Sequence, residues 1–92
     1  MKEGSYLAIR SGMPVVGRDS EEVGAVEEVL EDEGSGIFVG LVIKAGRLFG
    51  RSLFLPGEKV VRLHENVVTV DAGARDLEPY LRPEKVRASA EL

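Results

Sequence analysis

The chain of 92 residues contains no cysteine and no tryptophan, and its aromatic residues are three Phe and two Tyr. The absence of cysteine excludes disulfide scaffolds, cysteine-ligated zinc, iron–sulfur clusters and thiol nucleophiles. Because aromatic rings are few, any core must be built mainly from aliphatic side chains. Valine is abundant along the chain, and this β-branched residue favours strands over helices.

Long apolar runs are missing as well. Near the N-terminus only residues 6–9 are largely apolar before Arg10, whereas a signal peptide needs an apolar stretch of ~7–15 residues. A membrane-spanning helix needs ~20 such residues, and no segment approaches that length. The sequence therefore predicts a cytoplasmic protein that does not insert into a membrane.

The residue types that build catalytic and metal sites are scarce. His64 is the only histidine, and no partner in the sequence makes it half of a nucleophile–base pair or of a metal-ligand pair. The glycines in residues 34–36 and 46–50 do not match the spacing of phosphate-binding loops. We therefore predict a protein that is not an enzyme, with no catalytic residue, no metal site and no cofactor.

Charge is unevenly distributed within a net charge of −4. Residues 19–33 hold eight acids and no base, whereas residues 44–62 hold five bases and one acid. These segments are either solvated faces of neighbouring strands whose charges pair, or the acidic and basic faces of a molecule suited to self-association or to a charged partner. Net acidity argues against nucleic acid as the partner.

Six short segments carry strand signals and are separated by turn residues rich in glycine, proline and aspartate. Pro14 must stand at an edge or at a strand start, and the acidic pair Glu27 and Glu28 breaks strict alternation, which predicts a bulge. The predicted strands are residues 13–17, 23–32, 37–44, 52–56, 59–63 and 67–71. Their number and spacing predict an all-β fold, a small closed or partly open antiparallel β-barrel of five to six strands.

The pattern changes after Asp71. Asp76 is placed to cap a short helix that tolerates Pro79 in its first turn. We therefore expect a β-barrel domain over residues 1–72 and a short helical or flexible C-terminal extension over residues 73–92.

The glycine, valine and proline positions carry a family likeness. Residues 12–19, followed by the Val-Gly-x-Val-x-x-Val pattern that begins at Val23, resemble the opening of a PRC-barrel domain, and residues 40–63 resemble its middle. The likeness covers about residues 12–71. The family is similar in fold to the cytoplasmic domain of the photosynthetic reaction-centre H subunit and to the C-terminal domain of the ribosome maturation factor. It implies a non-catalytic protein-interaction or scaffold module, with a ribosome- or RNA-associated maturation factor as the alternative.

One apolar pair stands out between glycines. Leu48 and Phe49 are flanked by Arg47 and Arg51 in an expected loop. They either fold back to plug one end of the barrel or form an exposed apolar anchor ringed by cations. We take Arg47, Leu48, Phe49 and Arg51 as the candidate protein interface, for a protein partner or for a second copy in a homo-oligomer.

Overall fold

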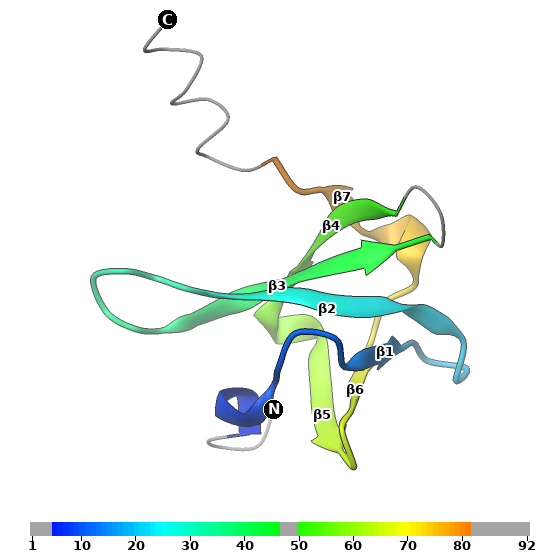
Figure 1. The fold of residues 1–92 in the computed structure, drawn as a ribbon, viewed down its shortest axis with the longest axis horizontal. Helices are drawn as coiled ribbons and strands as arrows, with labels where there is room; N and C mark the ends of the chain where they lie inside the picture. The colour runs from blue at the N-terminus through cyan, green and yellow to red at the C-terminus, as the bar shows by residue number, and fades with distance from the viewer. Residues whose placement is uncertain (1–4, 47–49, 82–92) are drawn as a thin grey trace, which may run out of the picture.

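Valine-rich segments between glycine and proline turns form strands throughout the chain. The computed structural model describes residues 5–46 and 50–81 (Figure 1). Its strands are β1 (Pro14–Val16), β2 (Glu22–Glu31), β3 (Phe38–Ala45), β4 (Arg51–Pro56), β5 (Val60–His64), β6 (Val67–Val70) and β7 (Glu78–Pro79). Three 3₁₀ turns complete it: η1 (Ser5–Ala8), η2 (Gly57–Lys59) and η3 (Ala74–Asp76). The described residues contain no α-helix, and so none that could cross a membrane.

The seven strands form one mixed sheet in the order β5-β6-β1-β2-β3-β4-β7. Neighbours are antiparallel except β1 and β6, which run parallel with Val15 opposite Val68. The parallel pair arises because the chain crosses over through β2–β5 before it returns beside β1. Figure 1 shows β2 and β3 as a long hairpin that reaches out from the rest of the sheet.

This topology confirms the all-β class and corrects the predicted barrel. Seven strands are present instead of five or six, one pair is parallel, and the sheet is open, with β5 and β7 at its edges. Parallel pairing joins segments far apart in the chain, so local alternation carried no signal for it. Pro14 stands at the start of β1, as its missing N–H group requires.

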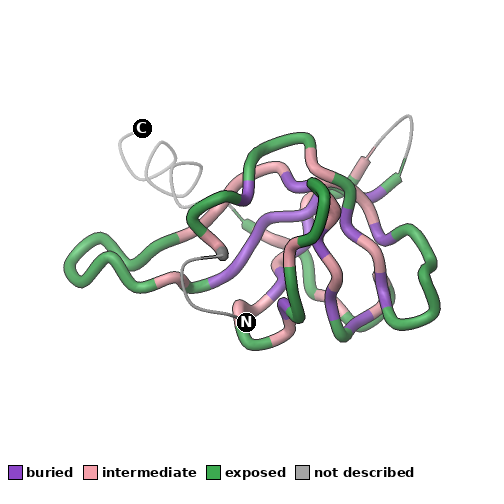
Figure 2. Tube along the Cα trace, turned by 90° about the horizontal axis from the view of Figure 1, so that it is seen from below, coloured by how far each residue is buried: buried purple, intermediate pink, exposed green. Residues whose placement is uncertain are grey.

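The core lies on the inner face of the sheet and is aliphatic, as predicted. Its buried members are Ile9, Val15, Val23, Val26, Leu41, Ile43, Leu55, Val60, Val68, Val70 and Ala72. Tyr6 and Phe38 pack against this cluster from its border and stack on each other with ring centroids 4.8 Å apart. Figure 2 shows the buried residues gathered in the body of the sheet, while the hairpin tip is exposed. No charged or polar side chain is buried in the described part of the chain.

The predicted bulge in β2 is present. The register with β3 shifts between Val26 and Glu28, so Val26 lies opposite Ile43 and Glu28 lies opposite Val42. Val26 is buried in the core, whereas Glu27 turns to the other face and accepts a hydrogen bond from the Ser52 hydroxyl at 2.8 Å. The extra residue therefore places both acids on the outer face of the sheet.

The turn between β2 and β3 also matches its prediction. Asp32 Oδ2 accepts hydrogen bonds from the hydroxyl of Ser35 at 2.9 Å and from the backbone N–H of Ser35 at 3.0 Å. These bonds, the hydroxyl first, lower the pKa of Asp32 because they favour the ionised carboxylate. The carboxylate therefore serves as a turn residue that fixes the hairpin tip.

The predicted C-terminal helix is wrong for residues 73–81, which form η3 and then β7. Asp76 does not open a helix: its carboxylate accepts the N–H of Gly73 at 2.9 Å and closes a single 3₁₀ turn. Leu77 is already extended, with φ −105° and ψ 151°. Glu78 precedes Pro79, a position that disfavours the helical region, so the chain continues as a strand beside β4. Residues 82–92 lie outside the described residues.

Candidate functional site

The outer face of the sheet carries a row of side chains across four strands. Glu28 lies opposite Val42, Val42 opposite Phe54, and Phe54 opposite Glu78. Directly opposed residues point to the same face of a sheet, so these four form one line on the side away from the core. A second line beside it contains Leu30, Gly40 and Pro56. The outer face therefore has an apolar centre with a carboxylate at each end of its first row.

Phe54 forms the floor of this centre. A Cβ atom on Gly40 would lie 3.0 Å from Cε1 of Phe54 and would overlap the carbonyl oxygen of Leu55, so only glycine lets the ring lie this close to β3. The Phe54 ring also stacks with Tyr80, with centroids 6.5 Å apart and planes at 28°. Val42 is fully buried. Phe54 is thus held between a strand and a second ring.

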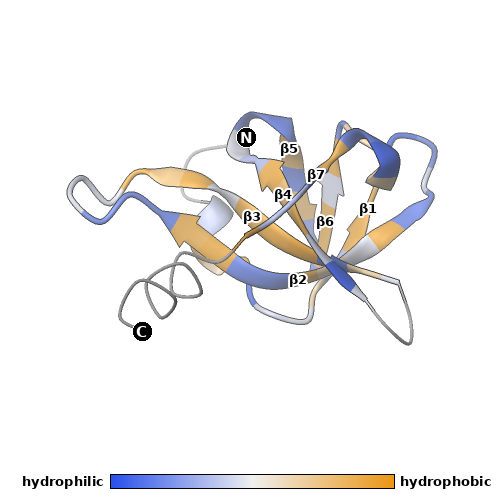
Figure 3. Cartoon of the chain, turned by 90° about the horizontal axis from the view of Figure 1, so that it is seen from above, coloured by the Kyte–Doolittle hydropathy of each residue, from blue (hydrophilic) through white to orange (hydrophobic). Residues whose placement is uncertain are grey.

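An open groove of about 650 Å³ follows this apolar centre. It is lined by Leu30, Val39, Phe54, Pro56, Asp76, Leu77, Glu78, Pro79 and Tyr80. Figure 3 shows hydrophobic colour along β3 and β4, the strands that supply its central part. Val39, at the hairpin side, is 43% exposed. The charged residues of the lining are Asp76 and Glu78, both acidic, and no described lysine or arginine lines it.

β7 forms the edge of the sheet beside the groove, and this edge is protected against pairing with a further strand. The Tyr80 N–H donates to the carbonyl of Ser52 in β4 at 2.9 Å, so the backbone nitrogen of the preceding Pro79 faces the free edge. That nitrogen carries no hydrogen. An incoming strand would therefore find no donor at this position, a common protection of edge strands.

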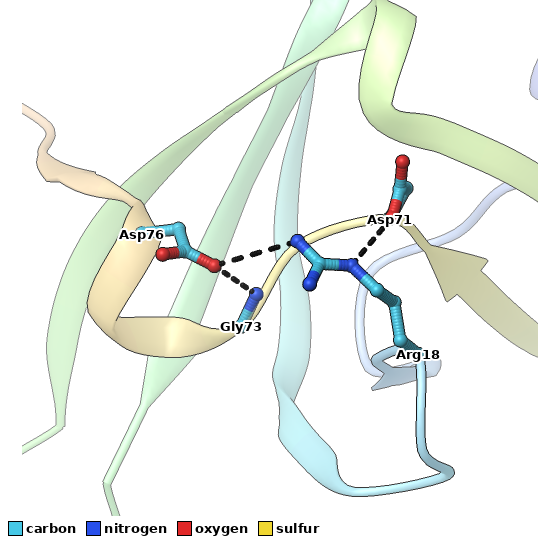
Figure 4. Close-up of polar contacts among 4 residues, drawn as sticks. All are labelled: Arg18, Asp71, Gly73 and Asp76. Atoms are coloured by element: carbon cyan, nitrogen blue, oxygen red, sulfur yellow. Dashed lines mark hydrogen bonds and ion pairs between the residues drawn. The ribbon is translucent and has the colours of Figure 1, made fainter.

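A polar corner supports the segment that forms one wall of the groove (Figure 4). Arg18, in the turn between β1 and β2, donates from Nε to Asp71 Oδ1 at 2.6 Å, and its Nη2 lies 3.8 Å from Asp76 Oδ2. The bond to Asp71, with the attraction of the same carboxylate, raises the pKa of Arg18. All three side chains are more than half exposed, so each contact is weak. Together they tie η3, and with it Leu77, to the β1–β2 turn.

The residues singled out in the sequence do not line this groove where the structure describes them. Arg47, Leu48 and Phe49 fall outside the described residues, and their interface role stays a prediction. Arg51 is exposed at the start of β4, opposite Ala45. His64 is exposed at the end of β5, and its Nε2 lies 3.9 Å from Oε1 of the neighbouring Glu65. Among the described residues, no group of three His, Asp or Glu side chains is placed to hold a metal ion.

The sequence does not predict the groove because its lining residues come from four separate strands, from η3 and from the residues beside β7. One local signal is present: Phe54 and Pro56 occupy alternate positions of β4 that interleave with the buried Leu53 and Leu55. An aromatic residue on the face opposite a buried pair indicates a second apolar surface.

The fold and this surface define a small all-β domain with one aliphatic core and an apolar groove on its outer face. The PRC-barrel domain family matches residues 10–77, most of the chain, and the chain belongs to that family. The resemblance drawn from the sequence is thereby confirmed. A search of curated proteins found no match.

Proposed function

We propose that this PRC-barrel domain is a non-catalytic protein-interaction module and that the groove on its outer face is the contact surface. The observation that carries the proposal is the apolar lining of the groove, which stands open to water beside the exposed Val39. Each Å² of apolar surface that is removed from water contributes about 25 cal/mol of favourable free energy. Covering the groove with a partner therefore supplies the free energy for association.

Two further observations support a binding role over a catalytic one. Asp76 in the groove already accepts the Gly73 N–H and lies near Arg18, an arrangement that suits a structural carboxylate. The floor residue Phe54 is fixed by Gly40 and Tyr80 before any partner arrives. A rigid aromatic floor lowers the ordering cost of association.

Replacing Val39 by aspartate is expected to abolish capture of the partner. Val39→Asp removes apolar contact from the groove wall and introduces a carboxylate that loses its water when a partner covers it, a cost that a flanking cation does not offset in full. The position is 43% exposed, so the fold tolerates the change. Val61 on β5, an edge strand of the sheet, offers a matched control because it is 48% exposed. Like Val39, which lies between Phe38 and Gly40 where the pairing with β2 shifts register, Val61 lies at a register shift, that of β5 with β6. The tagged protein and both variants are used to capture proteins from a lysate of the source organism, followed by quantitative mass spectrometry.

The proposal expects a set of proteins that Val39→Asp loses and Val61→Asp retains, with both variants melting within about 5 °C of each other. Equal recovery by all three proteins would contradict it. Recovery of the untagged chain alone, lost with Val39→Asp, would assign the groove to a second copy. Self-association through Arg47, Leu48, Phe49 and Arg51 stays a separate prediction. Neither Val39→Asp nor Val61→Asp changes any of these four residues.

A further inference from the structure

We propose that the groove takes a basic, apolar segment of a partner protein: apolar side chains that fill the groove, flanked by lysine or arginine. The proposal rests on the function proposed above and adds the chemistry of the partner. Three features of the outer face carry it: the sign of the charges around the groove, the blocked edge at β7, and the open form of the groove.

The charged side chains that line the groove itself are acidic, whereas Arg18 and Lys59 line a separate pocket on the other side of Pro56, Asp76 and Leu77. Glu78 and Asp76 line the groove, and the row that crosses its floor has a carboxylate at each end, from Glu28 and Glu78. Glu78 is exposed and forms no ion pair with another described residue. Among the described residues of β2, β3, β4 and β7, the base that shares this face is Lys44, which lies beyond Val42 and away from Pro56. A partner that places cations beside its apolar residues therefore matches the rim in sign.

The same charges argue against a second copy and against phosphate. A symmetric dimer through this face would bring the acidic rim of one chain against that of the other, and like charges brought together at an interface oppose association. A phosphate backbone or an anionic headgroup would meet the same repulsion. A positively charged protein segment is the occupant for which both the apolar floor and the rim are favourable.

The geometry indicates how the segment lies. Pro79 removes the donor at the free edge, so the segment covers the face and does not extend the sheet. Sites for small molecules usually bury about 70–90% of their ligand. The groove here is open along the hairpin side, where Val39 is 43% exposed. A chain segment that continues beyond the groove covers such a surface more completely than a small molecule does.

The test uses a display library of random short peptides, selected against the full chain and against Glu78→Lys. The expected result is enrichment of peptides in which lysine or arginine flanks large apolar residues. Their affinity, measured by fluorescence anisotropy, should fall about tenfold with Glu78→Lys, because attraction becomes repulsion at an exposed pair. Glu65→Lys, the same change in the exposed β5–β6 turn, should alter the affinity by less than about twofold.

The alternative results separate the two proposals. Enrichment of acidic or uncharged apolar peptides whose binding is lost with Val39→Asp would overturn the basic partner and leave the groove as a binding site. Equal weakening by Glu78→Lys and Glu65→Lys would show a general effect of net charge and would also overturn the inference. Peptides that bind equally to Val39→Asp, or no enrichment at all, would overturn both proposals.

Discussion

Replacing Gly24 by alanine is expected to lower the free energy of unfolding by about 3 kcal/mol, at the upper end of the usual cost of overpacking. A Cβ atom at this position would overlap the carbonyl oxygen of Lys44 and lie 2.8 Å from Cγ2 of Ile43. Both belong to β3. On its other side Gly24 is paired with Val15 of β1. Because β2 is held between two strands, the added methyl group forces the centre of the sheet to move.

The measurement is urea or thermal unfolding of the variant beside Gly34→Ala. Gly34 lies in the exposed hairpin turn, and a Cβ atom there would approach only Asp32 Oδ2, at 3.6 Å. Gly34→Ala should therefore change stability by no more than about 0.5 kcal/mol. Gly24→Ala should lower the melting temperature by roughly 12–24 °C for a domain of this size. Similar melting temperatures for the two variants would contradict the close approach of β2 and β3.

Replacing Leu55 by alanine is expected to cost a similar amount, about 3 kcal/mol, for the opposite reason. Leu55 is fully buried and lies opposite Leu41, which is also fully buried. Removal of its side chain leaves a cavity in an aliphatic core, and such substitutions cost about 2–5 kcal/mol. The neighbouring core residues are themselves buried and packed together, so they relax only partly into the space.

Leu81→Ala is the matched control for this core substitution. Leu81 is 79% exposed, so the same truncation there should change the free energy of unfolding by less than about 0.5 kcal/mol. Chemical denaturation of both variants gives the comparison. If Leu55→Ala were as stable as Leu81→Ala, the inner face of β4 would not be the core. A large loss at Leu55 together with a small loss at Val39→Asp separates the core face of the sheet from its binding face.

The sequence predicted the strands because each one is marked by local chemistry. Alternating apolar residues, with glycine, proline or aspartate at the ends, define all six expected strands within one residue of their observed bounds. The bulge was predictable too, since two adjacent acids cannot both follow a strict alternation without placing one in the core. The family likeness added the expected fold and agrees with the match over residues 10–77.

Features that depend on distant segments were not predictable in this way. The parallel pairing of β1 with β6 and the free edges of the sheet at β5 and β7 follow from the order of the strands. The alternation of apolar and polar residues along one strand does not encode that order. The sequence predicts a helix where β7 forms because Asp76 is a good cap residue. In the structure the Asp76 carboxylate instead accepts the N–H of Gly73 within one short turn. The groove combines side chains of β2, β3, β4 and β7, so no single stretch of sequence displays it.

The most direct test of the groove as the binding surface is a chemical-shift map of the ¹⁵N-labelled protein on addition of a display-selected peptide. Backbone amide shifts are expected to concentrate at groove residues such as Leu30, Val39, Phe54 and Tyr80, with little change along β5 and β6 at the other end of the sheet. Shifts concentrated on β5 and β6, with the groove residues unchanged, would contradict binding in the groove.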